Sequence, residues 1–324
     1  MGINSEQAQW FSSTFEQLVA NVEVAIRGKG DVIRLALTCL LSEGHLLLED
    51  NPGTGKTVLA KAIAHTVQGT QSRIQFTPDL LPSDVTGVTV FDQQTQRFQF
   101  HNGPIFATVV LADEINRASP KTQSALLEVM EESRVTVDGV AHQVGRPFMV
   151  IATQNPIEQA GTYRLPEAQL DRFLMKSSIG YPDHDVAVEL MQQAANRDRA
   201  ANVGSVIAAH AVAQMADMAN EVHVDGSVLS FIAQIAARSR EHQQVRLGVS
   251  MRGCLAYVRA AKTWAASKGR EYVLPDDVKD LAQPVLSHRI LLNPEAQFAG
   301  VGVDRIISDL VGSVPAPTQR AGIR

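Results

Sequence analysis

The fold of this chain follows from one stretch, Glu49-Asp50-Asn51-Pro52-Gly53-Thr54-Gly55-Lys56-Thr57. A short apolar run at 46–48 comes before it and is typical of a buried strand, and residues 58–64 after it have the composition of a helix. A strand, a glycine loop and a helix in this order are the context that a phosphate-binding loop requires. Backbone N–H groups of such a loop surround an anion, and the helix N-terminus adds partial positive charge.

In this motif the lysine, Lys56, reaches the β- and γ-phosphates of a nucleotide, and the hydroxyl of Thr57 holds Mg²⁺. The full pattern has glycine where this chain has Asp50, which is its chief departure from the motif. The alternative is a glycine-rich turn that binds nothing. The residues predicted to bind the phosphates are Pro52, Gly53, Thr54, Gly55, Lys56, Thr57 and Val58.

The composition is that of a globular protein with room for two domains. Hydrophobic residues make up 45% of the 324 residues and charged residues 19%. The net charge of −5 argues against broad nucleic-acid binding, which favours basic surfaces. No apolar stretch reaches the length of a membrane span, and the N-terminus lacks a signal-peptide pattern. We therefore expect a cytoplasmic protein without a membrane partner.

A second apolar strand at 108–112 ends in the acidic pair Asp113-Glu114. Carboxylates at the end of a strand, downstream of a phosphate-binding loop, form the Walker B arrangement. Asp113 then holds Mg²⁺ through water. Glu114 orients or deprotonates the attacking water. The alternative is an acidic pair that is simply solvated at a strand end.

A third buried strand at 148–153 is followed by Asn155. The side chain of Asn155 is placed to hydrogen-bond the γ-phosphate or the water, or else to form an Asx turn before proline. A fourth central strand is predicted at 174–179. The turn at 26–30 either holds the base of a nucleotide through its backbone or only joins two helices. After it, Asp31 is predicted to cap the helix that begins at residue 32.

The remaining pattern predicts an α/β domain followed by helices. We expect hairpins at 88–100 and at 134–144, the latter with a tight turn at Asp138-Gly139. Two prolines between residues 77 and 87 argue against a regular helix there. We predict a P-loop NTPase fold, with a three-layer αβα domain and a central parallel sheet at 1–181, a helical lid at 182–313 and a frayed tail at 314–324.

Several longer runs together resemble the AAA+ ATPases and, within them, the MoxR family. The resemblance extends from about residue 26 to about residue 294. Its most specific segments are RIQFTPDLLPSDVTG (73–87), GPIF (103–106), DEINRASPKTQ (113–123), ATQNPIEQ (152–159) and GTYRLPEAQLDRF (161–173).

The resemblance implies roles that spacing alone does not give. Asn155 matches the sensor 1 position, and Arg172 matches the arginine finger that reaches the ATP of a neighbouring subunit. Arg252 matches the sensor 2 arginine of the lid, and Arg117 is a second candidate for action in trans. The hairpin at 88–100 matches the helix-2 insert of this clade.

Other interpretations of the two main arginines remain open. Arg172 could pair with Asp171 or Glu167 on the surface. Arg252 could cap carbonyl groups in the lid.

The resemblance implies Mg²⁺-dependent ATP hydrolysis between subunits of a homo-oligomeric ring, expected to be a hexamer. The first function hypothesis is a chaperone-like remodeller that matures partner complexes or inserts their metal cofactors, often with a von Willebrand factor A-domain protein. The second is a motor subunit of a metal-chelatase-like or nucleic-acid-acting complex. The third is a nucleotide-binding scaffold without turnover, against which the intact Asp113-Glu114 pair argues.

Overall fold

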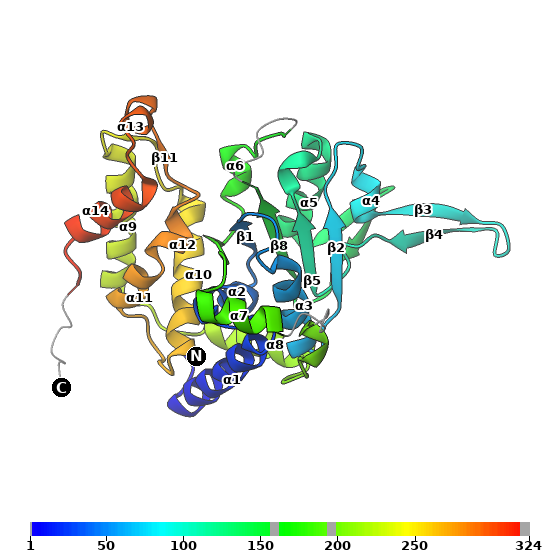
Figure 1. The fold of residues 1–324 in the computed structure, drawn as a ribbon, viewed down its shortest axis with the longest axis horizontal. Coiled ribbons are helices and arrows are strands. Elements are labelled where there is room, and N and C mark those ends of the chain that lie inside the picture. Colours follow the sequence, from blue (N-terminus) through cyan, green and yellow to red (C-terminus); the bar gives the residue numbers. More distant parts are fainter. Residues whose placement is uncertain (1, 156–161, 193–198, 318–324) are drawn as a thin grey trace. The chain divides into compact units, whose positions relative to one another are not determined.

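A computed structural model describes residues 2–155, 162–192 and 199–317 (Figure 1). Contacts divide the chain into two compact units. An α/β unit comprises Glu16–Phe173 and Ser177–Gln214, and a helical unit comprises Met1–Phe15, Leu174–Lys176 and Met215–Arg324. This division assigns α7 (His184–Gln192) to the α/β unit, whereas the sequence-based boundary fell just before it. The domain limits drawn from the sequence stay a prediction.

The central sheet contains five strands in the order β2-β5-β8-β1-β9. The pairs β2–β5, β5–β8 and β8–β1 are parallel, in agreement with the predicted fold. The strands are β1 (Leu46–Glu49), β2 (Gln71–Gln75), β5 (Val109–Asp113), β8 (Met149–Gln154) and β9 (Met175–Ser177).

Helices cover both faces of this sheet because the strands are apolar on both sides. Alternate strand residues, Val110 and Val150 among them, form one buried cluster with Leu126 and Leu127 of α5. The residues between them are also buried, and α3 contacts β2 and β5. The unit therefore has the three predicted layers. Its helices are α2 (Gly30–Leu41), α3 (Lys56–Thr66), α4 (Pro82–Thr86), α5 (Pro120–Glu132), α6 (Glu167–Leu170), α7, and the 3₁₀ turns η1 (Ile115–Arg117) and η2 (Arg199–Asn202).

Strand register brings the polar strand ends to one edge of the sheet. Thr153 of β8 lies opposite Leu48 of β1, and Asp113 of β5 lies opposite Gln75 of β2. Ligands of open α/β sheets bind at the carboxyl ends of the strands. The phosphate-binding loop and the acidic pair therefore follow neighbouring strand ends.

Two antiparallel hairpins, both predicted, extend from this unit. The first pairs β3 (Gly87–Asp92) with β4 (Arg97–Asn102) and projects beyond the sheet (Figure 1). The second pairs β6 (Arg134–Val137) with β7 (Val140–Gln143). Asp138 and Gly139 between them have φ of 50° and 78°, as a type I′ turn requires.

Two local predictions were wrong. The segment with two prolines contains the short helix α4, since its first residue, Pro82, needs no N–H bond there. Asp31 does not cap α2; it lies in the first turn, and Lys29 is the N-cap residue.

The helical unit contains longer helices, two of which have side-chain caps at their N-termini. Ser250 caps α10 by accepting a hydrogen bond from the N–H of Gly253, and Asp225 caps α9. A short strand pair and two C-terminal helices were not predicted.

In the described ranges, no helix combines the length and apolar character needed to cross a bilayer. The elements not yet given are α1 (Ser5–Glu23), α8 (Ala209–Asn220), α9 (Gly226–Glu241), β10 (Val245–Leu247), α10 (Met251–Ser267), α11 (Pro275–Asp280), α12 (Ala282–Leu286), β11 (Leu291–Leu292), α13 (Pro294–Phe298) and α14 (Val303–Ser313).

Candidate functional site

The loop between β1 and α3 has the backbone shape of a phosphate-binding loop. Gly53 and Gly55 have φ of 83° and 98°, and Gly55 is the N-cap of α3. A Cβ atom added to either glycine would meet nothing within 4 Å. These positions therefore need glycine for their left-handed backbone and not for lack of space.

Lys56 begins α3, and its ammonium group lies over the loop. The Nζ atom donates hydrogen bonds to the carbonyl groups of Asp50 and Asn51, each at 3.2 Å. Thr57 follows in the first turn of the same helix and is half-buried. The predicted lysine and hydroxyl thus stand side by side at the helix start.

Asp113 is the last residue of β5, and its carboxylate has two partners. Oδ1 accepts a hydrogen bond from Thr153 Oγ1 at 2.6 Å, and Oδ2 accepts one from Arg73 Nη2, also at 2.6 Å. Thr153 comes from β8 and Arg73 from β2. This buried carboxylate is therefore fixed from both neighbouring strands.

Glu114 directly follows the strand in a left-handed conformation, with φ of 57°. Such a backbone is uncommon for a residue other than glycine and is often found at functional sites. Its N–H donates to Thr153 Oγ1 at 2.8 Å. Its Oε2 accepts from Gln75 Nε2 at 2.7 Å and from Arg117 Nη1 at 3.0 Å. Hydrogen bonds thus hold the acidic pair, which is not simply solvated.

Asn155 is buried immediately after β8. The carbonyl of its neighbour Gln154 accepts a hydrogen bond from the N–H of Asp50 at 3.2 Å, so this strand end adjoins the phosphate-binding loop. The part of the resemblance that continues at 156–161 lies outside the described residues. The sensor role of Asn155 stays a prediction.

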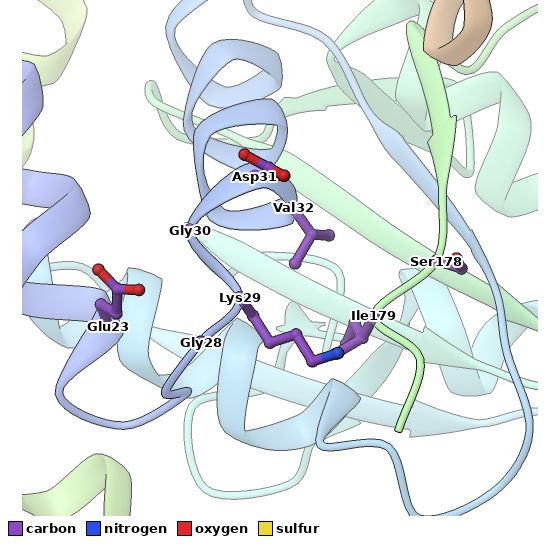
Figure 2. Close-up of a pocket in the computed structure, with 8 residues that line it drawn as sticks. All are labelled: Glu23, Gly28, Lys29, Gly30, Asp31, Val32, Ser178 and Ile179. Carbon is purple, nitrogen blue, oxygen red and sulfur yellow. The ribbon is translucent and has the colours of Figure 1, made fainter. Parts of the chain in front are cut away.

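A cavity of about 480 Å³ lies at the predicted turn 26–30 (Figure 2). In Figure 2 the Lys29 side chain extends toward the backbone at Ile179. Its Nζ donates a hydrogen bond to the carbonyl of Tyr181 at 2.8 Å. The cavity is lined by Glu23, Gly28, Lys29, Gly30, Asp31, Val32, Ser178 and Ile179.

The three predicted arginines differ in their surroundings. Arg172 forms an ion pair with Glu131 of α5 at 3.0 Å, and its buried Nε has no hydrogen-bond partner among the described residues. Arg117 contacts Glu114 of its own chain. Arg252 is exposed in the first turn of α10, within the helical unit.

The oxygen donors at this edge suit a magnesium ion. Thr57 supplies a hydroxyl and Asp113 a carboxylate, which are the hard ligands that Mg²⁺ prefers. The guanidinium of Arg73 shows that the Asp113 carboxylate accepts a cation. Among the described residues there is no group of three or more His, Cys, Asp or Glu side chains that could enclose a metal. Mg²⁺ usually takes few protein ligands and completes its shell with phosphates and water.

The sequence analysis did not predict the contacts that four residues make at this edge of the sheet. Arg73, Gln75 and Thr153 hold the acidic pair, and Asp50 had only been noted as a departure from the motif. Both carboxylate oxygens of Asp50 accept backbone hydrogen bonds beyond β9. Thr153 could have been noticed, because it is a polar residue that directly follows the apolar run at 148–152.

Comparison with known proteins shows which family this chain resembles. Residues 45–175 match the family model described as "ATPase family associated with various cellular activities (AAA)", and residues 237–310 match the AAA lid domain. The uncharacterised protein YeaC of Bacillus subtilis is 45% identical, over 94% of this chain and 96% of its own. Chaperone MoxR1 of Mycobacterium tuberculosis is 36% identical, over 95% of this chain and 84% of its own.

The fold is also similar to a solved structure. The crystal structure of a candidate ATPase from Cytophaga hutchinsonii superposes with a TM-score of 0.90 at 35% identity, covering 97% of this chain and 98% of that one. The matches span both the α/β unit and the lid, and they confirm the resemblance found in the sequence. This chain belongs to the MoxR family of AAA+ ATPases.

Proposed function

We propose that this protein hydrolyses ATP in a Mg²⁺-dependent reaction and uses the energy to remodel partner proteins. The proposal depends on one observation. A glycine loop with its lysine, two carboxylates held by hydrogen bonds and a buried asparagine all lie at the same edge of the sheet. Membership of the AAA+ family implies nucleotide binding, and we propose this loop as the place where it occurs.

ATP binding uses the loop, Lys56 and the cavity at residues 26–30. The loop N–H groups and the Lys56 ammonium bind the β- and γ-phosphates. The base enters the cavity beside Lys29 and Ile179. Thr57 and Asp113 hold Mg²⁺, which supplies charge neutralisation at the phosphate oxygens when bound.

Hydrolysis depends on Glu114. Its carboxylate takes a proton from water while the water oxygen bonds to the γ-phosphorus. The bond from that phosphorus to the β–γ bridging oxygen breaks, and ADP leaves with the electron pair. Asn155 hydrogen-bonds the γ-phosphate or the water. Gln75 and Arg117 both donate hydrogen bonds to Oε2 of Glu114 and so hold the carboxylate in place, and Oε1 is the oxygen that we assign to the water.

Assembly completes the site in this proposal. Arg172 of one subunit neutralises charge on the ATP of the next, within a homo-oligomeric ring that we take to be a hexamer. Arg252 contacts the nucleotide from the lid of the same subunit. Loss of the γ-phosphate then changes the lid contacts, and the hairpins transmit that motion to a partner.

The name of the relative Chaperone MoxR1 supports a chaperone-like role. We propose maturation or metal-cofactor insertion in partner complexes, with a von Willebrand factor A-domain protein as partner, in the cytoplasm. A motor in a chelatase-like or nucleic-acid-acting complex is the alternative. Stimulation of ATP turnover by DNA would favour that alternative.

The chemistry is tested with Lys56→Ala and Glu114→Gln. Lys56→Ala should lose ATP binding, and Glu114→Gln should bind ATP while losing turnover by about 100-fold or more. Lys61→Ala, in the same helix, is the matched control and should retain both. Full turnover in either test variant would refute the assignment.

Action in trans and partner identity need two further experiments. Mixed rings of Arg172→Ala and Glu114→Gln subunits should recover some turnover, and no recovery at any ratio would contradict the arginine finger. The Glu114→Gln protein with ATP should retain a partner in pull-downs that Lys56→Ala does not retain.

A further inference from the structure

Asp50 occupies the position where the phosphate-binding pattern has glycine, and it is only 5% exposed. Its Oδ2 accepts the N–H of Ile179 at 2.6 Å, and its Oδ1 accepts the N–H of Gly180 at 3.0 Å. Its own carbonyl accepts a hydrogen bond from Lys56 Nζ at 3.2 Å. A single residue thus contacts the phosphate-binding lysine and the chain that follows β9.

The segment after β9 suits a carboxylate in particular. Two successive N–H groups point at one side chain, and Gly180 has φ of 66°, which is the kind of backbone turn that forms an anion-binding concavity. A carboxylate offers an acceptor oxygen to each N–H, whereas asparagine offers one oxygen and a second donor. Glycine at position 50 would leave both N–H groups without this partner.

The same segment forms one wall of the cavity assigned to the base. Ile179 and Lys29 both line that cavity (Figure 2). The carbonyl of Tyr181 accepts the hydrogen bond of Lys29 Nζ. Hydrogen bonds therefore run from Lys56 through Asp50 to residues 179–181 and on to Lys29. This connected path joins the phosphate loop to the cavity.

We propose that Asp50 is a positioning residue. It fixes the position of the phosphate loop relative to the base cavity, so that one nucleotide fits both. The proposal rests on the proposed ATP binding at this site. Asp50 does not touch the nucleotide in this account; it acts through Lys56 and the backbone of 179–180. Restoring the glycine of the general pattern should therefore impair this protein.

The test compares ATP with inorganic tripolyphosphate, which occupies the phosphate loop and has no base. Asp50→Gly and Asp50→Asn should weaken ATP binding by about tenfold, the scale of one lost charge-assisted hydrogen bond. Tripolyphosphate binding should change by less than about threefold, because the loop glycines and Lys56 remain. In turnover assays, KM for ATP should rise more than kcat falls.

Asp277→Asn is the matched control, because Asp277 is a buried aspartate of the helical unit that also accepts a backbone N–H. It should lower the melting temperature without changing the ratio of ATP to tripolyphosphate affinity. If the Asp50 variants do not fold, Lys29→Met tests the far end of the path and should weaken ATP selectively too.

Equal losses for both ligands in the Asp50 variants, or an unchanged ratio in Lys29→Met, would overturn the proposal. These outcomes require a wild-type protein that binds ATP. Failure of the wild type to bind ATP would instead refute the proposed function.

Discussion

Two buried aspartates show how differently the two units use polar groups. Asp277, 1% exposed, accepts hydrogen bonds from Arg270 and from the N–H of Leu274, all within seven residues of chain. Asp50 accepts from Ile179 and Gly180, which are 129 and 130 residues away. The first carboxylate organises its own neighbourhood, whereas the second joins segments that only the folded sheet brings together.

The same contrast holds for the acidic pair. Asp113 is held by Arg73 and Thr153, each 40 residues distant along the chain. A local network in the helical unit needs only a turn of backbone, and its loss should affect stability. A long-range network at the sheet edge fixes reacting groups, and its loss should affect chemistry first.

The sharpest test makes the same substitution in both units. Asp113→Asn should reduce ATP turnover by about 100- to 1,000-fold, because it removes the charge that offsets phosphate. Its melting temperature should change little, since Arg73 is half-exposed and the amide oxygen can still accept from Thr153. Steady-state kinetics and calorimetry measure the two effects. An unfolded Asp113→Asn protein would contradict the view that the network at the sheet edge affects chemistry before stability.

Asp277→Asn should do the reverse. Asparagine removes the negative charge from a buried ion pair with Arg270, which costs about 3 kcal/mol in the free energy of unfolding. Turnover per folded molecule should stay within about twofold of the wild type at a temperature where the variant is folded. Denaturant unfolding gives the first quantity. A large loss of turnover without destabilisation would contradict the division of roles.

The contrast also explains how much could be predicted from the sequence. The phosphate loop, Asp113 and Glu114 are local patterns beside strands, and the fold class and both hairpins were predicted correctly from such patterns. The Ser119 cap of α5 is a local feature too, because its side chain accepts a hydrogen bond from the N–H of Thr122. Each of these features depends on residues a few positions apart.

The partners of the site residues could not be predicted in this way. Arg73 and Gln75 are two residues apart on β2 and therefore lie on the same face of the strand. They reach the acidic pair only because β2 lies beside β5. The contacts of Asp50 depend on the chain that follows β9. A single sequence gives strand positions but not the order of strands in the sheet, so these contacts remained hidden.

Thr153→Val should combine the two kinds of effect. The hydroxyl of Thr153 is fully buried, donates to Asp113 and accepts from the N–H of Glu114. Valine has a similar shape but removes the partner of Asp113 Oδ1 and of the Glu114 N–H, which costs about 2 kcal/mol of stability. Turnover should fall as well, because the Asp113 carboxylate and the Glu114 backbone lose their common support. Thr153→Ser should recover most of the turnover, and a serine variant no better than valine would exclude the hydroxyl as the cause.

The smallest effect is expected at an exposed long-range pair, which separates burial from sequence distance. Arg34 of α2 forms two hydrogen bonds with the Glu16 carboxylate of α1, and about half of the Glu16 side chain is exposed. The hydrogen bond from Arg34 lowers the pKa of Glu16 below its ordinary value of 4.5. A lowered pKa means that the pair stabilises the fold above pH 4.5 and that this contribution disappears as the pH falls through the folded-state pKa.

Arg34→Gln should therefore cost only about 0.5 kcal/mol at pH 7, because solvent screens an exposed pair. The difference in melting temperature between wild type and variant should shrink below pH 4.5 and vanish in stronger acid. Thermal melts of both proteins across this range measure it. A cost as large as that of Asp277→Asn would mean that burial does not determine the strength of these contacts. A difference that persists in acid would mean that Arg34 acts by packing and not through the Glu16 charge.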